Sequence, residues 1–260
     1  MTPKIGANIG ANVGADIGAA KGSDLGAVMW KERRSILRFR GSRSRLLLTM
    51  LSPLLLATFF PWQWGPEWVS QVPPLVLAFI VPAILVGLTV PDSFAGERER
   101  HTLQTLLASR LPDRAILWGK LAVSLLFGWG VTLCMMLLTL VVLNIAFWDG
   151  QLIMYTLPIG LGSLALSFLT AFLTGGLGVL LSLRSETAQE AAQKLMGLIL
   201  VPAILVQVVF FAFQERMGQV IESINGPQAL LIVLGVMLAL AVAIILLAMR
   251  SFRRSRLALI

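Results

Sequence analysis

The chain has 260 residues, of which 57% are hydrophobic and only 13% are charged. Soluble domains carry about 25% charged residues, so this composition excludes a soluble domain and indicates a protein with several membrane spans. The net charge of +8 does not indicate nucleic-acid binding, because the basic residues flank apolar segments instead of forming one patch with aromatic residues. The single cysteine, Cys134, excludes a disulfide framework, and its apolar surroundings predict a small buried side chain.

Residues 1–27 form a low-complexity segment with a repeated tetrapeptide of the type Ile-Gly-Ala-Asn. Glycine at every fourth position disfavours a helix by about 1 kcal/mol per residue relative to alanine, which predicts a mobile cytoplasmic tail. A helix that packs its glycine face closely against a partner is the alternative, since small residues at this spacing permit close approach of two backbones.

Residues 28–45 are strongly basic and contain an apolar stripe. The stripe consists of Met29, Trp30, Ile36, Leu37 and Phe39. This pattern predicts an amphipathic helix in the membrane interface. A plain topogenic basic segment is the alternative, and both place this end of the chain on the cytoplasmic side.

Six apolar segments follow, and together they predict an all-α membrane protein with six transmembrane helices. The predicted spans cover residues 46–62, 69–91, 121–148, 152–183, 195–213 and 228–249. Several prolines in the second segment predict kinks or a broken first turn. The fourth segment is too long for one straight crossing of about 20 residues, and its glycines predict close helix contacts or a break.

The distribution of lysine and arginine predicts the topology. Twenty of these residues fall before the first span, between spans two and three, between spans four and five, and in the C-terminal tail. The opposite side has only Arg216, together with Glu67, Asp149, Glu215 and Glu222. Cytoplasmic loops carry the excess of basic residues, so six spans with both termini in the cytoplasm are predicted.

The segment from Asp92 to Lys120 is the one long, charge-dense stretch between two long apolar segments, with nine charged residues. Such a segment is predicted to stand in water at one face of the membrane. Leu103, Leu106 and Leu107 form an apolar stripe at helical spacing, which predicts a short amphipathic helix that contacts another molecule. A solvated loop whose charges only fix the topology remains the alternative.

The six segments contain no Asp, Glu, Lys, Arg or His, which argues against an ion-coupled transporter and against an intramembrane hydrolase. The single histidine, His101, has no second histidine or cysteine nearby, so no metal site is expected. Gly119-Lys120 is followed by leucine and lacks the upstream glycine of a phosphate-binding loop. We therefore expect no nucleotide-binding or catalytic function in this chain.

The run DSFAGERER from Asp92, followed by Thr102-Leu103, Leu106-Leu107-Ala108-Ser109 and Gly119-Lys120-Leu121, resembles the ABC-2 type transporter permease family. The resemblance is most specific over these 30 residues and extends less specifically over a transmembrane domain at residues 28–256. It implies the membrane subunit of an ATP-binding-cassette transporter, commonly an exporter, in the plasma membrane of a prokaryote. This sequence departs from the usual family pattern at His101, Gln104 and Arg110, which concerns the shape of the loop after the coupling helix.

The resemblance also implies the site and the partners. The central segment corresponds to a cytoplasmic coupling helix between spans two and three that docks on a separate ATPase subunit. The implied coupling residues are Glu97, Arg98, Glu99, Arg100, Thr102, Leu103, Leu106 and Leu107. The second cytoplasmic loop is a further expected contact, at Ser185, Glu186, Gln189 and Glu190, with a solvated turn as its alternative.

This chain is then expected to bind no cofactor, with ATP and Mg²⁺ on the partner subunit, and to pair with a second permease subunit in the lipid bilayer. Two hypotheses from other classes stay open: a non-transporting membrane scaffold or assembly factor that binds a cytoplasmic partner, and a membrane-embedded lipid enzyme. The enzyme is disfavoured, because no set of acid, base and nucleophile is visible. The sequence selects no transported substrate.

Overall fold

The computed structural model describes residues 26, 28–33, 43–99, 113–212 and 226–251, and all regular structure within these ranges is helical. The helices are α2 (Arg43–Trp64), the 3-10 helix η1 (Gly65–Ser70), α3 (Pro73–Glu99), α5 (Asp113–Ala146), α6 (Leu157–Ser182), α7 (Ala188–Ala212) and α9 (Gly226–Ser251). The prediction of an all-α fold is confirmed for this part of the chain.

Four helices in the described ranges are long and apolar enough to cross a membrane. They are Pro73–Glu99, Ala115–Ala146, Leu157–Ser182 and Gln228–Ser251. These helices cover the predicted second, third, fourth and sixth spans. Helices α2 and α7 cover the segments predicted as the first and fifth spans.

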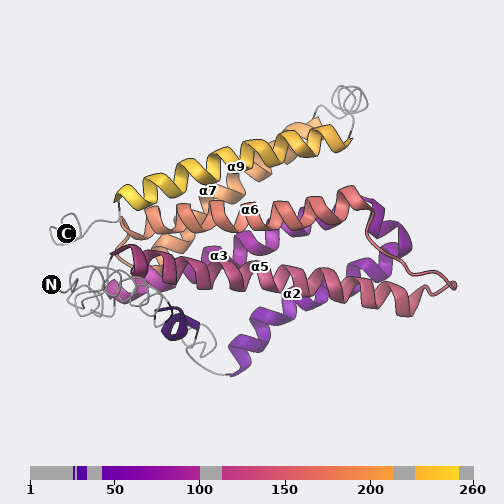
Figure 1. The fold of residues 1–260 in the computed structure, drawn as a ribbon, viewed down its shortest axis with the longest axis horizontal. Helices are drawn as coiled ribbons and strands as arrows, with labels where there is room; N and C mark the ends of the chain where they lie inside the picture. Colours follow the sequence, from indigo (N-terminus) through magenta and orange to yellow (C-terminus); the bar gives the residue numbers. More distant parts are fainter. Residues whose placement is uncertain (1–25, 27, 34–42, 100–112, 213–225, 252–260) are drawn as a thin grey trace, which may run out of the picture.

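Helices α3 and α6 form the centre of the bundle. Helix α3 packs on α5, α6 and α7, while α6 also contacts α9 (Figure 1). Helix α2 packs on α5, so that α2 and α9 lie at opposite edges of the bundle (Figure 1). The end of α3, the start of α5, the end of α6 and the start of α7 all lie at one end of the molecule (Figure 1).

Proline sets where two of the helices begin. Helix α3 begins at Pro73, after an extended Gln71, which fits the preference of proline for the first helical turn. Helix α6 begins at Leu157, with a proline in its first turn, five residues after the predicted start of the fourth span. It then continues without a break to Ser182, so the long fourth segment combines a non-helical entry with one helix.

The glycines of α6 mark close helix contacts, one of the two explanations that the sequence offered. A Cβ atom built on Gly178 would lie 2.9 Å from Cγ1 and 3.2 Å from Cβ of Val90 on α3. Val90 is fully buried in the core that α3, α5 and α6 share at the end where α3 terminates. Only a hydrogen at position 178 permits this approach of α6 to α3.

The prediction of a buried Cys134 is wrong. The side chain is exposed on α5, on the same side of the helix as the exposed Leu137, Val141 and Ile145. An apolar neighbourhood predicts burial in a soluble protein, but in a membrane helix it fits a lipid-facing surface equally well.

The charged segment between the second and third spans is helical at both ends. Helix α3 continues to Glu99, eight residues beyond the predicted end of the second span, and α5 starts at Asp113, before the predicted third span. The extensions bury Glu97 and Lys120 in the bundle, so these two side chains do not stand in water as predicted, whereas Asp92 and Glu99 are exposed. The proposed amphipathic helix at residues 100–112 lies outside the described residues.

We predict that Gly178→Ala destabilises the protein, because the added methyl group overlaps the stiff, β-branched Val90. The free energy of unfolding is expected to fall by about 1–3 kcal/mol. Each kcal/mol corresponds to a decrease of roughly 2–4 °C in the Tm measured in detergent. Gly235→Ala on α9 is the matched control, since its Cβ would meet no atom within 4 Å. Equal Tm values for the two variants would contradict a close α3–α6 contact.

Candidate functional site

A cluster of charged side chains joins three separate parts of the chain at one end of the bundle. We call it the polar junction and define it as Lys31, Glu32, Ser93, Glu97 and Lys120. The first two belong to the helical N-terminal segment at residues 28–33, the next two to α3, and Lys120 to α5. The junction therefore fixes the N-terminal segment on the α3–α5 pair.

Lys120 lies at the centre of the junction. Its Nζ atom is 3.0 Å from Oε1 of Glu97 and 3.3 Å from Oε2 of Glu32, and it donates a hydrogen bond of 2.9 Å to the carbonyl of Ser93. The Ser93 hydroxyl donates to Oε1 of Glu32. Lys31 completes the cluster with a contact of 3.2 Å to Oε1 of Glu97.

The contribution of this cluster to stability depends on how deeply its charged side chains are buried. The side chains of Lys120, Glu32 and Glu97 are only 3%, 5% and 10% exposed. A buried charge is costly unless an opposite charge and hydrogen bonds compensate it, and here two carboxylates balance two ammonium groups. Removing one member of the cluster is expected to destabilise the protein, because the remaining charges would then be buried without compensation.

A second set of contacts ties the loop between α6 and α7 to the end of α3. The Arg98 guanidinium donates to the carbonyls of Leu183 at 3.3 Å and Ser185 at 3.0 Å. Glu99 accepts a hydrogen bond of 3.2 Å from the backbone N–H of Ala188, the first residue of α7. A carboxylate at a helix N-terminus satisfies a free donor there and complements the helix dipole.

The start of α7 has its own local cap. The hydroxyl of Thr187 accepts a hydrogen bond from the Glu190 N–H at 3.1 Å, and the Glu190 carboxylate accepts from the Glu186 N–H at 2.9 Å. The hydrogen bond from Lys194, followed by that from the Glu186 amide, lowers the pKa of Glu190 below its ordinary value. The loop is therefore a defined structure held between α3 and α7.

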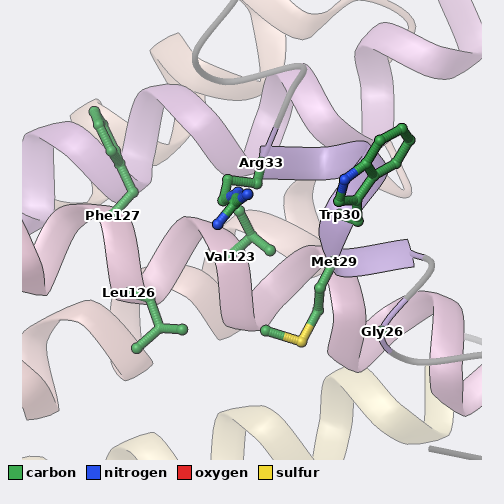
Figure 2. A pocket seen from close by; sticks show the side chains of 7 residues that line it. All are labelled: Gly26, Met29, Trp30, Arg33, Val123, Leu126 and Phe127. Carbon is green, nitrogen blue, oxygen red and sulfur yellow. The ribbon is translucent and has the colours of Figure 1, made fainter. Parts of the chain in front are cut away.

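An open groove lies beside the junction, between the N-terminal segment and α5 (Figure 2). Its volume is about 600 Å³. The walls are Gly26, Met29, Trp30 and Arg33 from the N-terminal side, and Val123, Leu126 and Phe127 from α5. The lining is apolar except for the Arg33 side chain and backbone groups.

Within the described ranges, no group of three histidine, cysteine, aspartate or glutamate side chains could hold a metal ion. The charged side chains of the junction are occupied with one another and with backbone carbonyls. The arrangement is suited to holding structural elements together.

Comparison with known families agrees with this architecture. The sequence model of the family described as ABC-2 type transporter matches residues 24–221, which is well over half of the chain. The chain belongs to this family. The match includes the N-terminal segment, the polar junction and the α6–α7 loop. A search of curated proteins finds no match.

As an ABC-2 type protein with four candidate spans in its described residues, this chain is a multi-pass membrane protein and a membrane permease of an ABC transporter. Members of this family are normally non-catalytic transmembrane components that pair with an ATP-binding subunit. The resemblance drawn from the sequence is thereby confirmed.

The structure brings together the described residues of the two expected ABC-2 contact regions. Arg98 and Glu99 touch the loop that carries Ser185 and Glu186. Glu97 is buried in the polar junction, so its carboxylate serves an internal contact. Ser185 is also buried, whereas Glu186 and Gln189 are exposed and Glu190 is half-buried. The other expected coupling residues, Arg100, Thr102, Leu103, Leu106 and Leu107, lie outside the described residues.

Of the five members of the junction, only Glu97 was predicted as a site residue from the sequence, and Glu32 and Lys120 are the two whose sequence context is most informative. Glu32 is the one acid within a basic run, and Lys120 follows a glycine at the entrance to a long apolar segment. An acid that interrupts a basic membrane-proximal run is a signal for an internal ion pair. The partner could not be found from local spacing, because Glu32 and Lys120 are 88 residues apart. The Thr187-x-x-Glu190 pattern, a capping signature, was also available.

We predict that Lys120→Met destabilises the permease by about 3–5 kcal/mol, because two buried carboxylates lose their shared cation. Thermal unfolding of the purified protein in detergent measures the effect. Lys194→Met is the control, since Lys194 is half-exposed and pairs with Glu190 one helical turn away, and a solvent-exposed ion pair of this kind contributes little to stability. A Lys120→Met variant as stable as the Lys194→Met variant would show that the buried pairs are not needed.

Proposed function

We propose that this chain is the permease subunit of an ABC exporter, driven by a separate cytoplasmic ATPase subunit. The contacts of the polar junction and of the α6–α7 loop support the proposal. Together they connect the end of α3 with the N-terminal segment, with α5 and with the loop between α6 and α7. Family membership supports a transporter over a non-transporting scaffold. The outward direction of transport follows the common activity of the family that the sequence resembles.

The proposed topology has six spans, with α2 and α7 as the first and fifth. Both termini lie in the cytoplasm of a prokaryote, and residues 28–256 form one transmembrane domain after a tail at 1–27. Support comes from the twenty basic residues assigned to the cytoplasmic side against one on the other. The position of the polar junction at one end of the bundle, away from the apolar middle of the helices, agrees with this orientation.

The proposed ATPase contact has two parts. The first is the amphipathic helix with Arg100, Thr102, Leu103, Leu106 and Leu107, whose leucines would enter a groove on the partner while the charges set orientation at the rim. The second is the exposed side of the α6–α7 loop at Glu186 and Gln189. Glu97, Arg98, Glu99 and Ser185 act behind this surface and hold its two parts together.

This arrangement offers a physical route for coupling. When the ATPase closes on ATP and Mg²⁺, it moves the contact surface, and Arg98 and Glu99 transmit that movement to the loop between α6 and α7. Because α3 and α6 are closely packed at Gly178, the helices respond as bodies and the bundle shifts between two packings. This chain itself would bind no cofactor.

A second permease subunit completes the proposed pathway, as a homodimer or a heterodimer. A single six-span chain provides half of such a pathway. The large apolar side chains exposed on α9 and α5 are available both to the surrounding lipid and to a second subunit.

We predict that Leu106→Asp abolishes both co-purification with the ATPase and stimulation of its ATP hydrolysis, because a carboxylate cannot enter an apolar groove without a partner. The measurement uses the chain co-expressed with its ATPase. Arg250→Asp is the control, since Arg250 is an exposed residue in the last turn of α9 and this change also adds an acid. Unchanged co-purification of Leu106→Asp would contradict the docking role.

Arg98→Ala separates docking from coupling in the same assay. It removes the ties to Leu183 and Ser185 and leaves the leucine stripe intact. We expect the ATPase to co-purify as before, while its stimulation falls about fivefold, the effect of roughly 1 kcal/mol of coupling energy. Full stimulation by Arg98→Ala would show that the α6–α7 loop does not transmit the movement.

A further inference from the structure

The groove between the N-terminal segment and α5 has the shape and lining of a binding site for a long apolar group. Its volume of about 600 Å³ lies in the range of ligand pockets. Val123, Leu126 and Phe127 extend the wall for about 6 Å along α5, at 1.5 Å rise per residue. Figure 2 shows Met29 and Arg33 facing this wall from the N-terminal segment.

The groove opens onto the outer surface of the bundle. Leu126 is 55% exposed, and Trp30 is 54% exposed. Because α5 is one of the helices suited to cross the membrane, lipid acyl chains can reach this surface. Tryptophan is enriched at the level of lipid headgroups, so Trp30 marks the depth at which an acyl chain meets its headgroup.

The charge at the groove selects the kind of lipid. Arg33 is exposed and lies at the end of the described N-terminal segment, on the groove wall (Figure 2). Its guanidinium can donate two hydrogen bonds at once to a phosphate group. The net charge of +8 adds a field that favours anionic over zwitterionic headgroups.

We propose that this groove binds one anionic glycerophospholipid of the surrounding bilayer. An acyl chain lies along Val123, Leu126 and Phe127, and the headgroup phosphate is held by Arg33. The lipid bridges the N-terminal segment and α5 next to the Glu32–Lys120 pair, so it reinforces the same junction from the membrane side. This role goes beyond the coupling function and needs no ATPase.

The test measures lipid retention by the purified full-length chain. The protein is reconstituted in nanodiscs with equal amounts of dioleoyl phosphatidylglycerol and dioleoyl phosphatidylcholine, transferred to detergent, and analysed by native mass spectrometry. We expect wild-type protein to retain phosphatidylglycerol in preference to phosphatidylcholine. Arg33→Gln should lower phosphatidylglycerol retention about fivefold, the factor for about 1 kcal/mol per basic residue, and leave phosphatidylcholine unchanged.

Matched variants control for charge and for apolar surface. Arg250→Gln removes an exposed charge at the same end of the bundle and should retain lipid like wild type. Leu126→Trp fills the groove and should lower phosphatidylglycerol retention, whereas Leu137→Trp changes a 63% exposed residue of α5 outside the groove and should not.

Three results would overturn the proposal. The first is equal retention of the two lipids by the wild-type protein, which would indicate apolar binding without headgroup selection. The second is an equal effect of Arg33→Gln and Arg250→Gln on lipid retention. The third is that the wild-type protein retains no lipid. Circular dichroism and size-exclusion elution of each variant establish that it is folded. A negative result here would leave the ATPase docking experiment unaffected, because that experiment reports on the leucine stripe.

Discussion

A cation inside a helix bundle needs an opposite charge within a few ångströms, and Lys120 meets this constraint with two carboxylates from different parts of the chain. Glu97 comes from the preceding helix, and Glu32 comes from the N-terminal segment. One ammonium group on α5 therefore joins this helix to α3 and to the N-terminal segment. This chain combines apolar packing along its helices with this ionic contact at one end.

Among the described residues, the internal contacts that the proposed coupling uses lie at the same end of the bundle. Arg98 and Glu99 follow Glu97 directly in sequence and bind the α6–α7 loop. The last turn of α3 therefore contacts both the polar junction and this loop. In the proposed coupling, movement applied to this turn would pass to α5 through Lys120 and to the end of α6 through Leu183. The groove between the N-terminal segment and α5 lies next to the same cluster, and a lipid bound there, as proposed, would contact it.

Composition, hydropathy and charge distribution predicted the helical class and the four spans that the described residues support. The family was predicted from the resemblance of the segment that begins at Asp92 to the ABC-2 type transporters. They did not predict the polar junction, because the charges of Glu97 and Lys120 resemble those of a solvated loop when only local sequence is considered. Pairing over 88 residues, as between Glu32 and Lys120, is a property of the folded chain. Cys134 shows the second limit, since apolar context cannot distinguish a lipid-facing side chain from a buried one.

The central claim is that the polar junction stands at the cytoplasmic face, where an ATPase can reach it. Labelling with a membrane-impermeant maleimide tests this claim most directly, in a Cys134→Ser background that carries either Glu186→Cys at the junction end or Asp149→Cys in the loop between α5 and α6. Both positions are exposed. The account predicts that Asp149→Cys reacts in intact cells and Glu186→Cys reacts only after the cells are opened. Reaction of Glu186→Cys in intact cells would contradict it.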